Sequence, residues 1–158
     1  MGIEIERKFL VASAAWRPEV RRSQPMVQAY LASHPGCSIR VRIAGDDARL
    51  NIKGRTIGAS RAEFEYPLPI ADARELVATL GGPVVEKTRH HVQYAGRNWE
   101  VDEFAGANEG LVVAEVELDR EGDEFARPPW VGREVTGDSR YYNVALAEHP
   151  WREWRHEA

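Results

Sequence analysis

The segment GIEIERKFLV at positions 2–11 alternates charged and apolar side chains over most of its length. In a β-strand, successive side chains point to opposite faces of the sheet. Glu4, Glu6 and Lys8 therefore lie on one face of a predicted strand, while the isoleucines and Phe9 lie on the other. The chain thus begins with a strand that has a charged face.

The same alternation recurs in seven further segments, which turn-forming residues separate. The eight predicted strands cover residues 3–11, 26–32, 38–44, 48–54, 61–68, 84–95, 97–104 and 111–119. Short breaks such as Pro35-Gly36 and Ala95-Gly96 favour tight connections, so consecutive strands are expected to be antiparallel neighbours.

Two segments change to the helical period. Residues 70–80 follow Pro69 and end before Gly81-Gly82-Pro83, which predicts a helix with a defined start and stop. A second helix is predicted from the residues after Ser139 to those before Pro150. Shorter helical turns are predicted at 13–16 and 123–126.

Charged residues recur at alternate positions of the predicted strands, so they share one face of the sheet. They are Glu4, Glu6, Lys8, Arg40, Arg42, Arg49, Lys53, Arg61, Glu63, Glu65, Lys87, Arg89, Glu100, Asp102, Glu115 and Glu117. In an open sheet this face would meet solvent, where each cross-strand ion pair contributes about 0.2–1 kcal/mol. In a closed sheet the same face would line a lumen. The pattern alone fits both arrangements.

A charged lumen would suit a polyphosphate and its metal. Guanidinium and ammonium groups bind phosphate oxygens, and carboxylates are hard ligands for Mg²⁺ or Mn²⁺. The candidate phosphate-binding residues are Lys8, Arg40, Arg42, Lys53, Lys87 and Arg89. The candidate carboxylate ligands are Glu4, Glu6, Glu115 and Glu117.

Composition narrows the class of protein. The chain has 158 residues, 43% of them hydrophobic, and a formal net charge of −4. Residues 1–158 are therefore expected to form one domain, and the acidic charge argues against a nucleic-acid or membrane-surface partner. Since no stretch is apolar over the roughly 18 residues of a membrane span, the sequence predicts a soluble, cytoplasmic protein. The sequence leaves the oligomeric state open.

Other motifs carry little chemistry. Cys37 is the single cysteine, so it cannot form an internal disulfide. His90 and His91 are adjacent on a predicted strand and should point to opposite faces, which excludes a shared metal site.

The ordered motifs resemble those of the CYTH superfamily, the triphosphate tunnel metalloenzymes. Glu4-Ile5-Glu6-Arg7-Lys8 is similar to the ExExK signature of that family. Similar segments follow in the family's order: SIRVR at 38–42, IKG at 52–54, EFE at 63–65, EKTR at 86–89, EVDEF at 100–104, AEVEL at 114–118 and VTGDSRYYN at 135–143. The ordered set, which spans nearly the whole chain, is far more specific than ExExK alone.

This resemblance implies an α+β fold: an eight-stranded antiparallel β-barrel that forms a closed tunnel, with helices packed outside. It implies a metal-dependent inorganic triphosphatase, similar to the short bacterial members, which hydrolyses tripolyphosphate to pyrophosphate and phosphate. Three alternatives stay open: a class IV-type adenylate cyclase, a nucleoside or thiamine triphosphate phosphatase, and a noncatalytic polyphosphate-binding module.

The resemblance also assigns roles to residues. The expected metal ligands are Glu4, Glu6, Asp102, Glu115 and Glu117. The candidates to orient water or assist a second ion are Glu63, Glu65, Glu100 and Asp102. Lys8 would bind the reacting phosphate, and Tyr30 would approach Lys8 there. The number of ions and the choice between Mg²⁺ and Mn²⁺ are left open.

Overall fold

Alternating side chains form strands close to the predicted positions. The computed structural model describes residues 2–157, and this part of the chain contains nine strands. They are β1 Gly2–Val11, β2 Val20–His34, β3 Cys37–Ala44, β4 Asp47–Gly54, β5 Ser60–Pro67, β6 Val84–Tyr94, β7 Arg97–Phe104, β8 Val112–Glu117 and β9 Val131–Glu134. The expectation of one domain over residues 1–158 stays a prediction.

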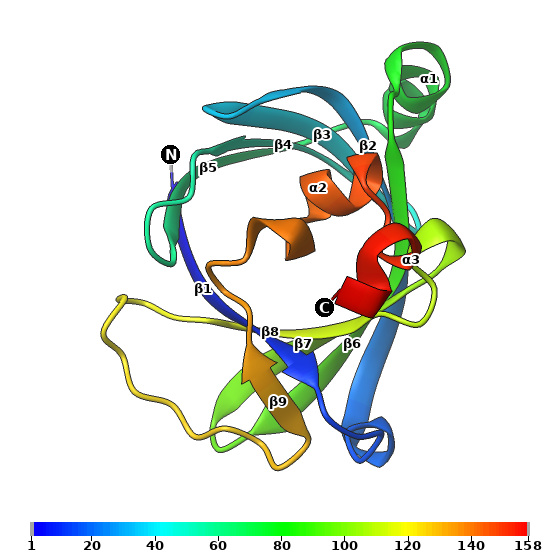
Figure 1. Cartoon of the computed structure of the whole chain (residues 1–158). Coiled ribbons are helices and arrows are strands. Elements are labelled where there is room, and N and C mark those ends of the chain that lie inside the picture. Colours follow the sequence, from blue (N-terminus) through cyan, green and yellow to red (C-terminus); the bar gives the residue numbers. More distant parts are fainter. Residues whose placement is uncertain (1, 158) are drawn as a thin grey trace.

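Eight of the strands close into an antiparallel barrel, which confirms the predicted fold (Figure 1). The order around the ring is β5-β4-β3-β2-β6-β7-β8-β1, and β1 also pairs with β5. Residues 2–5 of β1 bind β5, and residues 6–10 bind β8. Because β1 bonds to both neighbours, the ring is closed. The ninth strand, β9, pairs with the end of β1 at Phe9 and Val11.

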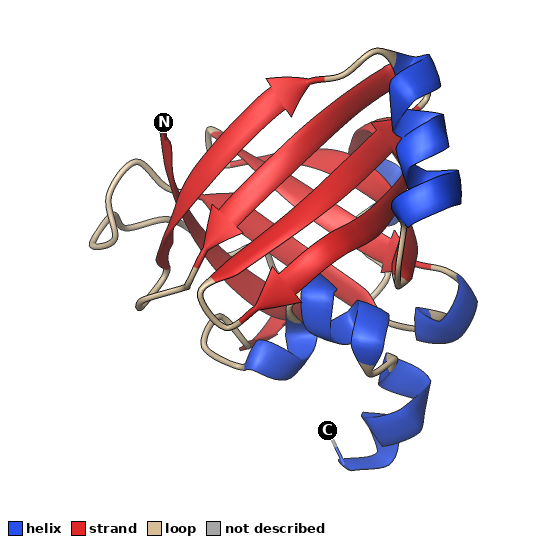
Figure 2. Ribbon diagram, turned by 90° about the horizontal axis from the view of Figure 1, so that it is seen from above, coloured by secondary structure: helices blue, strands red, loops and turns tan. Residues whose placement is uncertain are grey.

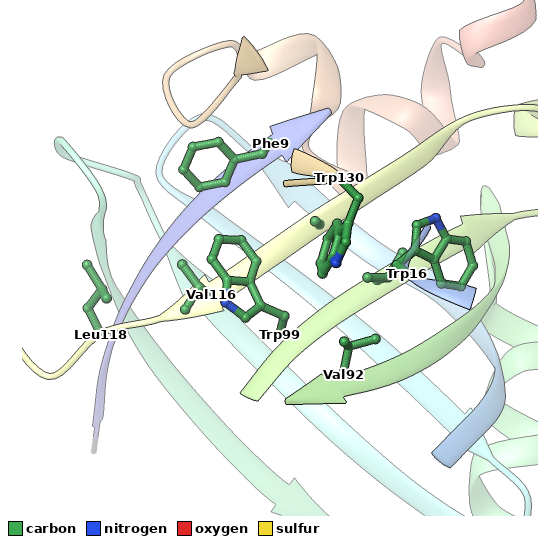
Figure 3. Packing of buried hydrophobic residues seen from close by; sticks show 9 residues of the cluster. Phe9, Trp16, Val92, Trp99, Val116, Leu118 and Trp130 are labelled. Atoms are coloured by element: carbon green, nitrogen blue, oxygen red, sulfur yellow. The ribbon is translucent and has the colours of Figure 1, made fainter. Parts of the chain in front are cut away.

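Apolar side chains face outward from the barrel and form the core there. In Figure 3, Phe9, Trp16, Trp99 and Trp130 pack over the outer face of β1, β7 and β8. Trp99 is fully buried, and its ring lies 5.7 Å from Phe9 and 5.9 Å from Trp130. Burial of such large aromatic side chains determines which residues of each strand face outward. A shift of the strand register by one residue would turn the aromatic side chains inward and the charged ones outward, into the apolar core.

Helix α1 (Ile70–Leu80) covers another part of the outer face, as Figure 2 shows. Its Ala73 packs against Val41 and Ala48 of β3 and β4. The helix follows Pro69 and stops at Gly81, where a side chain would clash with the carbonyl of Val77. The prediction for residues 70–80 is confirmed.

The C-terminal segment lies across one end of the barrel (Figure 1). It comprises the 3-10 turn η3 Ser139–Tyr141, helix α2 Asn143–Glu148, helix α3 Trp151–Trp154 and the turn η4 Arg155–Glu157. Tyr141, Leu146 and Trp154 are buried against Val85 and neighbouring residues. None of the described helices is long and apolar enough to cross a membrane.

The second predicted helix was wrong in its extent. Instead of one helix up to Pro150, the chain makes η3, extends at Tyr142 and then forms α2. The side chain of Asp138 accepts a hydrogen bond from the Arg140 backbone and caps only a single turn. The extended backbone at Tyr142 then reorients the chain, which directs Asn143 toward the barrel interior.

Other boundaries also differ. The helical turn predicted at 123–126 does not form. Instead, Asp123 closes a turn with Arg120, donating from its backbone N–H to the Arg120 carbonyl and accepting from the Arg120 N–H through its carboxylate. The turn predicted at 13–16 lies later, at η1 (Arg17–Glu19), where Pro18 occupies the first turn. A further 3-10 turn, η2, spans Gly106–Asn108. Strand β2 is longer than predicted, and β9 was not predicted.

Candidate active site inside the barrel

Most of the charged residues on the shared face of the strands point into the barrel, where they line a cavity of about 330 Å³. This volume lies in the range of about 300–1,000 Å³ that is usual for small-ligand sites. Seven carboxylates line it: Glu4, Glu6, Glu63, Glu65, Glu100, Glu115 and Glu117. Seven bases line it: Arg22, Arg40, Arg42, Lys53, Arg61, Lys87 and Arg89. Of the two arrangements that the sequence allowed, the structure has the charged lumen.

The two signs of charge are partly segregated. Carboxylates concentrate on the adjacent strands β7, β8 and β1, whereas the inward residues of β3 and β4 are mostly basic. Across β1 and β8, Glu6 lies directly opposite Glu117. Across β7 and β8, Glu100 lies directly opposite Glu115. Like charges in opposed positions repel each other. Bases that reach this wall offset part of the repulsion, with Arg89 2.7 Å from Glu100 and Arg61 3.8 Å from Glu6.

The closeness of these carboxylates affects their pKa values. Burial, followed by the nearby charges of Glu115 and Glu4, raises the pKa of Glu6 to about 8. Burial also raises the pKa of Glu100 and Glu117, and further carboxylates add to both effects. A cation that approached these groups would favour their ionised forms.

Glu4 belongs to a bonded network at the β1–β5 junction. Lys53 Nζ lies 3.1 Å and Arg61 Nε 2.8 Å from the Glu4 carboxylate. Burial alone would raise the pKa of Glu4, but these two cations and Glu63 together lower it. Burial and the hydrogen bond with Glu4 raise the pKa of Glu63 to about 7. Glu63 can therefore exchange a proton near neutral pH.

Asp102 lies beneath Lys87 and Arg89. Its carboxylate accepts hydrogen bonds from Lys87 Nζ at 2.7 Å and from Arg89 Nε at 2.8 Å. The Asp102 side chain is only 1% exposed and does not line the cavity. Burial would raise its pKa, but the two cations lower it strongly. Asp102 thus holds two bases in place and has little freedom to bind a metal.

Lys8 lies at the end of the tunnel that α2 crosses. Its Nζ is 3.3 Å from the carbonyl oxygen of Tyr141, 3.6 Å from Glu115 and 5.5 Å from the ring centre of Tyr142. A smaller cavity of about 30 Å³ brings Lys8 together with Tyr30 and Arg40. Tyr30 therefore lines the same end of the tunnel as Lys8.

Arg40 supplies an unused donor. Its side chain is buried, lines both cavities and has an Nε without a hydrogen-bond partner among the described residues. A buried N–H without an acceptor costs about 1–3 kcal/mol. Arg42 lies 3.5 Å from Glu65, which also accepts a hydrogen bond from Asn51 at 2.7 Å. An anion in the cavity would satisfy the Arg40 donor.

The carboxylate oxygens are suitable ligands for a divalent cation. No three Asp, Glu, His or Cys side chains within residues 2–157 are close enough to form a ready ligand set. The opposed pairs Glu6–Glu117 and Glu100–Glu115 nevertheless supply hard oxygen donors on one wall. Hard donors of this kind suit Mg²⁺ or Mn²⁺, which retain some of their waters.

The structure brings nearly all the predicted site residues to the interior. Asp102 is the exception, since it lies behind the lining. His90 and His91 point apart as predicted: His90 packs against Trp16 outside the barrel, and His91 lines the cavity. Sequence reasoning assigned no role to Asn143, which enters the tunnel from α2. Its segment resembles a family motif, but an isolated Asn beyond the last predicted strand gives no periodic signal.

The raised carboxylate pKa values predict an unusual pH dependence of stability. The pKa of Glu6 and Glu63 is near 4.5 in the unfolded chain but about 8 and about 7 in the folded protein. At a pH between these values, the folded protein binds protons that the unfolded chain has lost. Their stabilisation is therefore complete below about pH 4.5 and is lost as the pH rises through 7 to 8. We expect the Tm in EDTA to fall by several degrees between pH 5.5 and 7.5.

The variant Glu6→Gln provides the control for this effect. Burial lowers the pKa of His91, which acts in the opposite direction, but its contribution is shared by both proteins. The difference in Tm between wild type and Glu6→Gln thus isolates the carboxylate. A difference that stays constant over this pH range would show that Glu6 does not hold the extra proton.

Comparisons with known proteins agree with this geometry. The model of the CYTH domain family matches residues 2–145. A protein of Acetivibrio thermocellus named inorganic triphosphatase is 44% identical over 156 residues, which cover 98% of this chain and 99% of that protein. An inorganic triphosphatase of Nitrosomonas europaea is 37% identical over 148 residues, covering 91% of this chain and 96% of that protein.

Solved structures show the same fold. A crystal structure of an inorganic triphosphatase superposes with a TM-score of 0.67 at 35% identity, covering 93% of this chain and 95% of that chain. A structure from Hippeastrum shares the fold at 15% identity, with a TM-score of 0.56 over 74% of this chain and 80% of that chain. With its charged tunnel, its ordered motifs and these relatives, the chain belongs to the CYTH family.

Proposed function

We propose that this protein is an inorganic triphosphatase that depends on a divalent cation and hydrolyses tripolyphosphate to pyrophosphate and phosphate. The observation that carries the proposal is the closed tunnel, in which a carboxylate wall faces a basic wall across a cavity of about 330 Å³. The names of the relatives at 44% and 37% identity support the same activity.

Basic residues bind the substrate in this proposal. Arg40 uses its free Nε, and Arg42 and Lys53 extend the basic wall along β3 and β4. Lys87 and Arg89 face them from β6. A linear anion held between these walls is fixed at several points, which lowers the entropic cost of reaching the transition state.

Carboxylates of the acidic wall hold the cation. Glu6, Glu115 and Glu117 are best placed, and Glu4 adjoins them on β1. When bound, Mg²⁺ or Mn²⁺ would neutralise phosphate charge and polarise the reacting phosphoryl group. We assign Asp102 to the positioning of Lys87 and Arg89 and not to the metal, because both cations occupy its carboxylate.

We assign Glu63, which lines the main cavity, to accept the proton of the attacking water. Its pKa of about 7 suits a base that acts near neutral pH. The water oxygen forms a bond to the terminal phosphorus, the bridging P–O bond breaks, and pyrophosphate leaves. Lys8 balances charge that develops on the terminal phosphate, and Tyr30 lines the same end. Glu65 positions Arg42 and Asn51.

An organic triphosphate is the second candidate substrate. A groove of about 1010 Å³ adjoins the tunnel and shares Lys53, Arg61 and Tyr142 with its end cavity. His34, Arg140 and other residues of the β2–β3 turn and the C-terminal segment line the groove. A nucleoside or thiamine group would fit there while the phosphates enter the tunnel.

A substrate panel tests the proposed function. Tripolyphosphate, ATP and thiamine triphosphate are incubated with Mg²⁺, Mn²⁺ or EDTA, and phosphate, pyrophosphate and cyclic AMP are quantified. We expect the highest kcat/KM with tripolyphosphate and no turnover in EDTA. Cyclic AMP formation, or tight binding of tripolyphosphate without cleavage under every condition, would contradict the proposal.

Tripolyphosphate should stabilise the metal-free protein strongly. A ligand at 100 times its Kd stabilises the folded state by about 2.7 kcal/mol. For a chain of this size, this corresponds to a rise in Tm of about 5–10 °C. Sulfate at matched ionic strength is the control and should give a much smaller shift. Equal shifts with both anions would indicate general screening instead of a site in the tunnel.

The cytoplasmic location, the absence of nucleic-acid and membrane partners, and the choice between Mg²⁺ and Mn²⁺ stay predictions. The panel addresses the choice of metal directly, because each substrate is tested with both cations.

A further inference from the structure

Helix α2 lies across one end of the tunnel (Figure 1). Asn143 is the first residue of this helix. It lines both the main cavity and the small end cavity. The extended backbone at Tyr142, with φ −68° and ψ 141°, separates η3 from α2 and turns the chain at this point. Asn143 is thus a part of the C-terminal segment that reaches the phosphate-binding residues.

The side-chain oxygen of Asn143 contacts a buried cation. Lys87 Nζ lies 3.1 Å from Asn143 Oδ1 and 2.7 Å from Asp102 Oδ2. Gln28, which is fully buried on β2, donates through Nε2 to the same Oδ1 at 3.4 Å. The Lys87 side chain is only 1% exposed, so these oxygens define where its ammonium group lies.

We propose that Asn143 is a positioning residue for substrate binding, which holds the Lys87 ammonium group toward the phosphate while Gln28 fixes the Asn143 amide. The inference rests on the proposed function for the identity of the anion. It makes the seating of α2 part of the binding site, because Lys87 obtains its second oxygen partner only when α2 lies across the tunnel end.

A neutral partner suits this position. An ammonium group has three N–H donors, and Asp102 and Asn143 occupy two of them. The third donor remains for a phosphate oxygen. Asp102 already supplies one full negative charge, and a second carboxylate would weaken the attraction between Lys87 and an anion.

Three variants test this role. Asn143→Ala removes the acceptor. Asn143→Asp keeps an oxygen acceptor but adds negative charge. Asn108→Ala is the matched control, because Asn108 anchors the same C-terminal segment through Leu146 and Trp151 but lies outside the tunnel lining. For each variant we would measure kcat, KM for tripolyphosphate, Tm in EDTA, and the rise in Tm caused by tripolyphosphate in EDTA.

We expect Asn143→Ala to lower kcat/KM by about 10- to 100-fold, mainly through KM, because hydrogen bonds to charged groups are of this strength. Its Tm shift with tripolyphosphate should fall in parallel. Asn143→Asp should raise KM at least as much while its Tm in EDTA stays at or above that of wild type. Asn108→Ala should lower the Tm in EDTA but change KM by less than about twofold.

Two results would overturn the inference: a KM of Asn143→Ala within about twofold of wild type, or an equal rise in KM for Asn108→Ala, which would indicate that only the attachment of the segment matters. Failure of the proposed function is distinguishable, since wild type would then not cleave tripolyphosphate. In that case the Tm shifts caused by tripolyphosphate in EDTA decide. Smaller shifts for the Asn143 variants than for Asn108→Ala support the inference, and equal shifts, or a smaller shift for Asn108→Ala, refute it.

Discussion

Lys8→Ala should lower kcat/KM for tripolyphosphate by about 100- to 1,000-fold, the usual effect of removing one donor that stabilises charge in a transition state. The Lys8 ammonium group is buried at the tunnel end, 3.6 Å from Glu115, where a low dielectric strengthens its attraction to phosphate. Removing it also leaves Glu115 with one cation fewer. The measurement is steady-state phosphate release with saturating Mg²⁺.

Arg7→Ala is the matched control for this variant. Arg7 is adjacent to Lys8 on β1 but points outward, where it pairs with Glu134 and its guanidinium lies 5.4 Å from the ring centre of Phe125. We expect Arg7→Ala to reduce stability and to leave kcat/KM within about threefold. If Lys8→Ala retained more than a tenth of wild-type activity, Lys8 would have no major part in the reaction.

Asp102→Asn should produce the largest loss of stability. The substitution leaves Lys87 and Arg89 buried without their shared carboxylate, and breaking a buried ion pair in this way costs about 3–5 kcal/mol. For a chain of this length we expect the Tm to fall by about 6–20 °C. Activity should also fall, because both bases lose their positions. Thermal and urea unfolding in EDTA measure the effect.

Glu103→Gln serves for comparison. Glu103 follows Asp102 on β7, but it points outward and pairs with Arg17 at a partly exposed site. Its loss should cost less than about 1 kcal/mol. If Asp102 were a metal ligand instead, Asp102→Asn would leave the Tm in EDTA nearly unchanged and would reduce only the affinity for Mg²⁺. That result would restore the original expectation for Asp102.

The faces of the barrel could be predicted because they follow from local periodicity. Alternation places Glu4, Glu6 and Lys8 on one side and Phe9 on the other, whatever the neighbouring strands are. Closure of the barrel does not follow from local periodicity. It depends on β1 pairing with β5 over its first half and with β8 over its second. The charge pattern fits an open or a closed sheet, and the family resemblance predicted a closed barrel but not this division of β1.

The role of each charged residue inside the barrel depends on the pairing register between neighbouring strands. Sequence periodicity does not specify this register. Glu115 and Asp102 have the same parity and similar local sequence, yet Glu115 lines the cavity and Asp102 lies behind it under two cations. The extended backbone at Tyr142 was likewise hidden, because the residues after Ser139 have good helical spacing. Asn143 therefore entered the site through a break that the sequence did not reveal.

The most direct test of the charged tunnel as the site of hydrolysis is a phosphorus NMR time course of tripolyphosphate with wild type and Lys8→Ala, each in Mg²⁺ and in EDTA. We predict equimolar phosphate and pyrophosphate from wild type in Mg²⁺, and almost no product in the other three samples. Cleavage by wild type in EDTA, or equal rates for the two proteins in Mg²⁺, would contradict the account.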